Sequence, residues 1–217
     1  MAHRPGPASG LKRVMARLAP LTLLVLCGAC RFGGSDKDDD DEEDDAEEQG
    51  SADSGPDLSG SCSAEALRLI DLVNAYRAEN DLPAIPASPS LCAVGATHVD
   101  DLSAHPRDES AGCNLHSWSE FGDWTPCCYT PDHAEAQCMW DKPRELGPYP
   151  GNGYENAASG VTSAEEALAG WQSSPGHNDV ILNQDVWAAY PWGAIGAGFA
   201  GGYSVLWFGV EADPAGQ

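Results

Sequence analysis

The hydrophobic positions in residues 63–80 recur every three to four residues, which is the spacing of an amphipathic helix. Ser63 is a typical N-cap residue, and Pro83 follows the stretch as a helix breaker. One face of this predicted helix carries the apolar side chains Leu69, Ile70, Val73 and Tyr76. We therefore expect a helix over residues 63–80 that packs one side against a core.

A second helix is predicted from Ser88-Pro89 onward, because serine caps helices and proline is favoured in the first turn. Its apolar face carries Leu91, Val94 and Leu102, and His98 lies on the same face. A single histidine on an apolar helical face is typical of a hydrogen-bonded core residue. We therefore interpret His98 as part of the core and not as a ligand.

The third predicted helix covers residues 162–172 and opens with the capping pattern Thr162-Ser163-Ala164-Glu165. Near the C-terminus the period changes to two, on either side of a Gly201-Gly202 turn. The alternating residues are Ile195, Ala197 and Phe199 before the turn, and Tyr203, Val205 and Trp207 after it. This pattern predicts a β-hairpin in the core. Helices followed by strands favour an α+β fold with an antiparallel sheet.

Residues 1–30 are typical of an export signal, with basic residues, then a short apolar stretch at 18–26, then small residues before Cys30. The segment Leu26-Cys27-Gly28-Ala29-Cys30 resembles a bacterial lipoprotein cleavage box, which predicts lipidation of Cys30. The alternative is an ordinary secretory signal cleaved near Ala29. With a lipid anchor at Cys30, Arg31 in place of aspartate resembles the sorting pattern of outer-membrane lipoproteins of the cell envelope in cells with two membranes. Without the anchor the protein would be extracellular.

Residues 31–61 are expected to form a disordered acidic linker, because Asp36 to Glu48 contains eleven acidic residues and lacks hydrophobic bulk. We interpret it as a spacer in preference to a calcium site or a partner site. The formal charge of the chain is −23, and residues 62–217 alone contribute five basic and twenty-one acidic residues. This balance argues against a nucleic-acid partner, which requires a basic surface.

Six cysteines remain in the exported part: Cys62, Cys92, Cys113, Cys127, Cys128 and Cys138. An even number in an exported chain predicts three disulfides, whose connectivity the sequence leaves open. Adjacent cysteines rarely bond to each other, so Cys127 and Cys128 are expected to reach different partners. A zinc site made of the last four cysteines is the alternative. Residues 118–149 show neither helical nor strand periodicity and are interpreted as a disulfide-fixed loop.

Three segments carry candidate chemistry: Cys113-Asn114-Leu115-His116-Ser117, Gly153-Tyr154-Glu155-Asn156-Ala157-Ala158, and Ser173-Ser174-Pro175-Gly176-His177 with Trp171 just before it. We expect Glu155 and His177 on loops either side of a short helix. In this order the segments resemble the CAP superfamily, also called the SCP domain, which includes cysteine-rich secretory, antigen-five and pathogenesis-related-one proteins. The resemblance implies a CAP domain over residues 62–212 and sharpens the fold to a three-layer α-β-α sandwich with a central antiparallel sheet, stabilised by disulfides.

The resemblance also implies that His116, Glu155 and His177 face one open, water-filled cleft. Two imidazoles and a carboxylate suit a divalent cation such as zinc, with one position left for water. Ser174 stands where the family usually has a second glutamate, which removes one carboxylate from the set. Without a metal, a histidine paired with a carboxylate could act as a base.

Each candidate residue also has a simpler interpretation. Glu155 and Asn156 could hold their own loop through bonds to backbone groups. Ser174 next to His177 raises the possibility of a serine hydrolase, but no nucleophile-elbow pattern surrounds it. A set of aromatic residues could line a lipid or glycan groove, although packing of the insert is the favoured role. These are Trp118, Trp124, Trp140, Tyr149 and Tyr154.

The sequence therefore predicts an exported, lipid-anchored CAP protein that binds a lipid, glycan or protein ligand at the cell envelope. A metal-assisted, protease-like hydrolase using the same cleft is the alternative, and a purely structural surface protein is a third possibility. Binding is favoured over catalysis, because a fold can keep the geometry of a site without its chemistry.

Overall fold

The computed structural model describes residues 61–107 and 112–216. These residues belong to one compact unit, residues 50–217. The predicted signal peptide, its lipidation site Cys30 and the acidic linker up to residue 60 lie outside the described residues. None of the described helices has the length and hydrophobicity that a membrane span requires.

Three helices lie where the periodicity predicts them. Helix α1 covers Ala64–Glu79, α2 covers Pro89–Ala104, and α5 covers Ala164–Gln172. Each is preceded by a serine whose hydroxyl accepts a hydrogen bond from a backbone N–H in the first turn. The caps are Ser63, Ser88 and Ser163. Local sequence therefore determines where each of these helices begins.

The sheet has three antiparallel strands in the order β1-β3-β2. Strands β2 (Ala194–Ala200) and β3 (Tyr203–Gly209) form the predicted hairpin, and the two turn glycines adopt positive φ angles of 57° and 83°. Strand β1, Tyr154–Ser159, contains Glu155, which the sequence analysis placed in a loop. That expectation is wrong, because all the residues of β1 pair with residues of β3.

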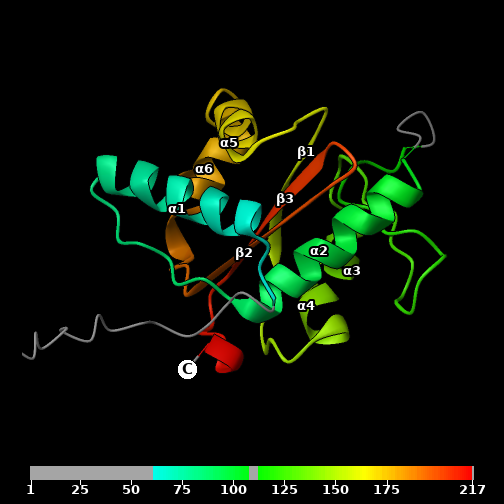
Figure 1. The fold of residues 1–217 in the computed structure, drawn as a ribbon. Coiled ribbons are helices and arrows are strands. Elements are labelled where there is room, and N and C mark those ends of the chain that lie inside the picture. Colours follow the sequence, from blue (N-terminus) through cyan, green and yellow to red (C-terminus); the bar gives the residue numbers. More distant parts are fainter. Residues whose placement is uncertain (1–60, 108–111, 217) are drawn as a thin grey trace, which may run out of the picture. The chain divides into compact units, whose positions relative to one another are not determined.

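Helices cover both faces of the sheet (Figure 1). Successive residues of β3 point to opposite faces, so Leu206 and Phe208 join one hydrophobic cluster with α1 and α5, while Val205 and Trp207 join another with α2. Helix α6, Pro175–Ile181, belongs to the first cluster. The fold is therefore the predicted α+β, three-layer α-β-α sandwich.

Helix α2 lies unusually close to β2. A Cβ atom added to Gly196 would lie 2.3 Å from the carbonyl carbon of Leu91, and one added to Gly198 would lie 2.2 Å from the carbonyl oxygen of Gly95. Glycine in the strand therefore allows the helix backbone to approach the sheet directly. This contact fixes the part of α2 from which His98 projects.

Three disulfides connect Cys62 with Cys92, Cys113 with Cys128, and Cys127 with Cys138. The adjacent cysteines reach different partners, as predicted, and the alternative zinc site is wrong because its four cysteines are oxidised in pairs.

The interpretation of residues 118–149 as a loop is only partly correct. This insert contains two short helices, α3 (Ala136–Trp140) and α4 (Lys142–Leu146). Further along the chain lie two short 3-10 helices, η2 (Asp185–Ala189) and η3 (Pro214–Gly216).

Candidate ligand-binding cleft

The carboxylate of Glu155 lies at the centre of a buried cluster. Its side chain has no exposed surface, and each oxygen accepts a hydrogen bond from a different histidine. The Nδ1 atom of His98 lies 2.6 Å from Oε1, and the Nδ1 atom of His116 lies 2.8 Å from Oε2. Burial raises the pKa of Glu155, but the two imidazoles outweigh burial and hold the pKa below its ordinary value. The carboxylate is therefore ionised at neutral pH.

Contacts at both ring nitrogens and on the ring face fix the orientation of His98. Its Nε2 atom lies 3.1 Å from the carbonyl oxygen of Ser117, and the ring stacks on Trp118 with a centroid distance of 4.2 Å. Arg107 donates to the same Ser117 carbonyl and also pairs with buried Asp101 of α2. The core position predicted for His98 is confirmed, since the residue is fully buried. Its partnership with Glu155 was not foreseen.

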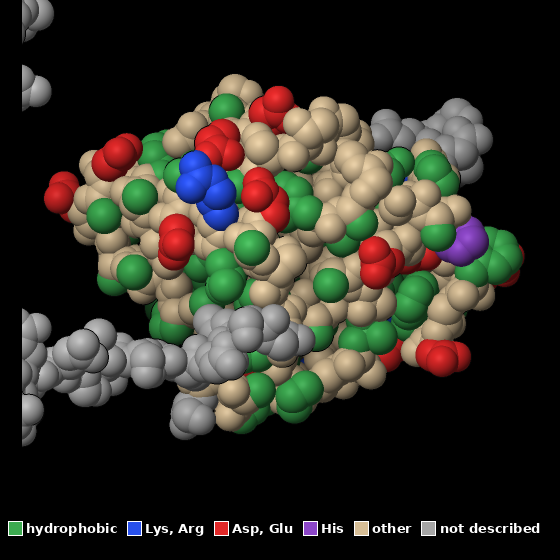
Figure 2. Space-filling model, viewed as in Figure 1, with side chains coloured by type: hydrophobic (Ala, Val, Ile, Leu, Met, Phe, Trp, Pro, Cys, Tyr) green, Lys and Arg blue, Asp and Glu red, His purple; other side chains and the backbone are tan. Residues whose placement is uncertain are grey.

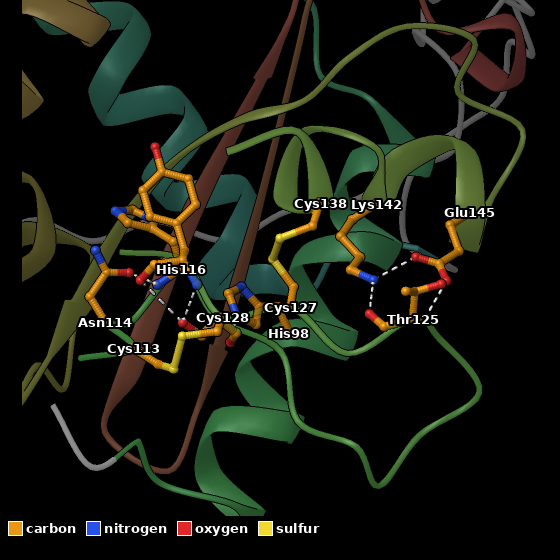
Figure 3. The surroundings of a disulfide bond; sticks show 12 residues. His98, Cys113, Asn114, His116, Thr125, Cys127, Cys128, Cys138, Lys142 and Glu145 are labelled. Atoms are coloured by element: carbon orange, nitrogen blue, oxygen red, sulfur yellow. Dashed lines mark hydrogen bonds and ion pairs between the residues drawn. A yellow bond between two sulfur atoms is a disulfide. The ribbon is translucent and has the colours of Figure 1, made fainter. Parts of the chain in front are cut away.

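His116 lies in the loop after α2, beside the Cys113–Cys128 disulfide (Figure 3). Its backbone N–H donates to the side-chain oxygen of Asn114 at 3.0 Å, which fixes the loop locally. Because Nδ1 faces Glu155, the Nε2 atom on the other side of the ring is free of protein hydrogen bonds within the described part of the chain.

His177 lies in the first turns of α6, and not in a loop as expected. Its Nδ1 atom lies 2.8 Å from the hydroxyl oxygen of Ser174, the residue that precedes the helix. Burial, and then the neighbouring His116, lower the pKa of His177, so the ring is neutral at pH 7. Asn156 of β1 donates its side-chain N–H to the backbone oxygen of His177 at 3.1 Å, which ties α6 to the sheet.

These groups line one cavity of about 510 Å³, which we call the cleft. Its polar side consists of His116, Tyr129, His133, Glu155, Asn156, Ser174, Gly176 and His177. Its apolar side consists of Met139, Trp140, Tyr154, Val180, Val186, Trp187 and Tyr190. The four site residues named from the sequence therefore border the same cavity. The side chain of Glu155, however, has no exposed surface and so does not face open water as expected.

A model of the CAP family, described as the cysteine-rich secretory protein family, matches residues 70–188, which is more than half of the chain. The chain belongs to the CAP family. No curated protein matches it.

Two solved bacterial structures resemble the chain. An extracellular protein containing an SCP domain from Bacillus anthracis str. Ames shares 19% identity over 68% of this chain, with a TM-score of 0.50. A cysteine-rich secretory protein from Staphylococcus aureus subsp. aureus Mu50 shares 13% identity over 74% of this chain, with a TM-score of 0.45. The CAP chain spans 40% of the length of each of these structures.

The three-ligand zinc centre expected from His116, Glu155 and His177 does not fit this CAP domain. Both carboxylate oxygens of Glu155 already accept imidazole hydrogen bonds, so Glu155 has no free oxygen to offer an ion as the third ligand. Across residues 61–107 and 112–216, no group of three or more His, Cys, Asp or Glu side chains is placed to hold a metal ion. Glu155 therefore orients imidazoles and does not ligate a shared ion.

Some aromatic residues of the CAP domain pack in the core, and others line the cleft. Trp118 and Tyr149 are buried in the core, as the packing interpretation expects, and Trp124 packs edge-on against Trp118. Trp140 and Tyr154 line the cleft instead, with ring centroids 5.5 Å apart.

Sequence reasoning missed several lining residues: Tyr129, His133, Trp187 and Tyr190. The first two lie in the insert, where the hydroxyl of Tyr129 is 2.7 Å from Nδ1 of His133. The other two lie in and just after η2, with ring centroids 5.3 Å and 5.2 Å from that of Tyr154 and 5.4 Å from each other. The signal that could have found this last pair is an aromatic residue repeated at three-residue spacing between a helix and the hairpin.

Proposed function

We propose that this CAP domain is an exported binding module whose cleft takes an amphipathic organic ligand. The observation that carries the proposal is the cleft itself, in which an aromatic wall meets a cluster of oriented imidazole and amide groups in one cavity of about 510 Å³. Cavities of this size and mixed lining are typical small-molecule sites.

The aromatic wall supports binding of an apolar group. Tyr154 has the rings of Trp140, Trp187 and Tyr190 at centroid distances of 5.2 to 5.5 Å. Val186, next to Trp187, keeps 66% of its surface exposed although it borders the cleft. An apolar ligand group would cover this surface, and burial of apolar area contributes about 25 cal/mol per Å².

Catalysis has less support than binding. Glu155 has no free oxygen with which to take a proton from a substrate, since both accept hydrogen bonds from histidines. Ser174 contacts His177, but no acidic side chain in the described residues orients the other nitrogen of that ring. The metal-assisted hydrolase therefore remains the weaker alternative.

The proposed location is the cell envelope. Three disulfides require an oxidising compartment, which supports export. The similar Bacillus anthracis protein is extracellular by its description. We further propose that Cys30 carries the lipid anchor of an outer-membrane lipoprotein. Intact-mass measurement of the membrane-extracted protein should show acyl chains on Cys30, and a protein cleaved near Ala29 without acyl chains would contradict the anchor.

Binding can be tested with the neutral fluorescent probe N-phenyl-1-naphthylamine and a chain carrying Cys30→Ser, which removes competing acyl groups. We expect saturable fluorescence enhancement that falls at least about tenfold in affinity in Trp187→Ala, since burial of a large side chain is worth a few kcal/mol. Val186→Asp should weaken binding as well. Because Val186 is exposed, this substitution should not disturb the fold, so weaker binding would not be explained by misfolding.

The matched control is Phe121→Ala. Phe121 is 68% exposed and is not part of the cleft lining. It should bind the probe as the parent chain does. Equal affinity in the parent, Trp187→Ala and Val186→Asp chains would contradict the proposed site.

A further inference from the structure

One wall of the cleft is formed by the η2 segment, by which we mean residues 183–190. Val186, Trp187 and Tyr190 of this segment line the cleft, yet none of its residues is buried. The ring of Trp187 contacts that of Tyr154 edge-on, with a centroid distance of 5.3 Å. Because no side chain of the segment is fully enclosed, packing alone leaves its position weakly determined, and polar contacts must supply the rest.

The side chain of Asn183 ties the two ends of the η2 segment together. Its Nδ2 atom donates a hydrogen bond to the backbone carbonyl of Tyr190, seven positions along the chain. The backbone of Asn183 has a φ of 51°, in the left-handed region that asparagine tolerates better than most residues. Trp187 lies inside the loop that this hydrogen bond closes, so the bond limits where its ring can lie.

Arg77 of α1 holds the same asparagine from the core. Its guanidinium donates to the side-chain oxygen of Asn183 at 2.7 Å, to the backbone oxygen of Pro83 at 3.0 Å, and to that of Ile181. A guanidinium can only donate and the carbonyl of Tyr190 can only accept, so the amide of Asn183 has one possible orientation. Both contacts of Asn183 therefore require an amide side chain.

Arg77 is 2% exposed and has no acidic partner within residues 61–107 and 112–216. Residues 62–217 carry twenty-one acidic side chains and five basic ones, and acidic side chains are spread over the face shown in Figure 2, where basic ones are few. A buried cation without an acidic partner depends on its neutral acceptors. The hydrogen bonds of Arg77 therefore fix the segments that it contacts.

We propose that Asn183 is a positioning residue of the cleft, held in place by Arg77, and that it keeps Trp187 and Tyr190 in the binding geometry before a ligand arrives. This inference rests on the proposed binding function and goes beyond it, because neither Arg77 nor Asn183 lines the cleft. The wall is then preformed, and a ligand does not have to order it. Preorganisation of this kind raises affinity by removing the cost of ordering a loop on binding.

The substitution Asn183→Asp separates the two contacts of this side chain. A carboxylate still accepts from Arg77 and tolerates a left-handed backbone, so the core contact remains. It cannot donate to the carbonyl of Tyr190, so the tie between the two ends of the η2 segment is lost.

Amide hydrogen exchange in the Cys30→Ser chain, without any ligand, measures the consequence. The N–H groups of Trp187 and Tyr190 donate to backbone oxygens inside the η2 segment, so their exchange reports its opening. In Asn183→Asp they should exchange about two- to tenfold faster, which corresponds to the net contribution of one hydrogen bond. Phe208 in the central strand β3 should keep the exchange rate of the parent chain.

The matched control is Asn74→Asp in α1. The Nδ2 atom of Asn74 donates to the backbone oxygen of Ile85 at 3.0 Å, and its side-chain oxygen accepts from the N–H of Ile85 at 2.8 Å. Neither residue lines the cleft. This variant loses the same kind of amide donor, but exchange at Trp187 and Tyr190 should not change.

Binding of N-phenyl-1-naphthylamine is the second readout. Asn183→Asp should weaken it about two- to tenfold, and Asn74→Asp should leave it unchanged. Parent-like exchange at Trp187 and Tyr190 in Asn183→Asp, an equal rise at Phe208, or unchanged probe affinity would overturn the positioning role. A parent chain that does not bind the probe would contradict the proposed function instead, and the exchange rates would still decide whether Asn183 holds the segment.

Discussion

The Nδ1 atom of His98 lies 2.6 Å from Oε1 of Glu155, and this contact joins helix α2 to strand β1 across 57 positions of sequence. Both side chains are fully buried. His98 therefore holds the carboxylate of Glu155 inside the core, and His116 contacts its other oxygen from the side of the cleft. One glutamate thus couples the packing of the core to the orientation of an imidazole that lines the cleft.

The first prediction concerns the stability that this pair confers. His98→Leu should lower the free energy of unfolding by about 3–5 kcal/mol, because it leaves a buried carboxylate with one partner instead of two. Urea unfolding followed by tryptophan fluorescence measures this loss. The double variant His98→Leu with Glu155→Gln should recover part of it, since no isolated charge remains. A loss below about 1 kcal/mol in the single variant would show that the buried carboxylate does not depend on His98.

The second prediction concerns the dependence of stability on pH. The folded-state pKa of Glu155 is lowered from an ordinary 4.5, so its contribution to stability is present above that value and is lost as the pH falls through the folded pKa. The pKa of His177 is lowered from 6.5, so the unfolded chain takes up its proton first and stability also declines as the pH falls below about 6.5.

Melting temperatures between pH 8 and pH 3 measure both effects. His177→Gln should flatten the decline that begins near pH 6.5, and Glu155→Gln should flatten the part below about pH 4.5. A parent chain whose melting temperature is constant from pH 7 to pH 5 would contradict the assignment to His177.

The third prediction concerns the close approach of α2 to the sheet. Gly196→Ala should destabilise the protein by at least about 1–3 kcal/mol, because the new Cβ would meet the backbone of Leu91 at 2.3 Å. Gly170→Ala is the matched control, since it lies in α5 with no atom within 4 Å of the added Cβ. There alanine should stabilise the helix by about 0.5–1 kcal/mol. Equal effects at the two sites would argue against the tight helix–strand contact.

The fourth prediction separates two disulfides by function. Replacing Cys113 and Cys128 with serine should cost about 2–4 kcal/mol of stability and also change the nitrogen-15 signals of His116, because that bridge holds its loop. Replacing Cys62 and Cys92 should cost a similar stability but leave the His116 signals unchanged, because that bridge joins the start of α1 to α2. Unchanged His116 signals in both variants would refute the role of the first bridge.

The sequence predicts those elements whose burial follows a regular period. Helices α1, α2 and α5 and the β2–β3 hairpin each bury residues at the spacing of their own geometry. Strand β1 was not predicted because its buried residues include Glu155 and Asn156. Buried polar residues obscure the alternation of apolar and polar positions that identifies a strand. Helices α3 and α4 were not predicted because each has five residues, which are too few to show a helical period.

The sequence predicted only some of the residues of the site, for a related reason. The motifs around His116, Glu155 and His177 point to one cavity, and these residues line it. His98 has the same pattern as any buried helical residue, so its role depends on a contact that only the fold creates. The zinc site was expected from the types of residue alone. The sequence could not show that both oxygens of Glu155 already accept hydrogen bonds from histidines.

The most direct test of the binding account is a map of backbone amide shifts in the Cys30→Ser chain titrated with N-phenyl-1-naphthylamine. The account predicts that the shifted amides cluster at Tyr154 and Asn156 in β1, at His177 in α6, and at Val186 and Trp187 in η2. Shifts that cluster around Phe121, or a spectrum that does not change at saturating probe, would contradict it.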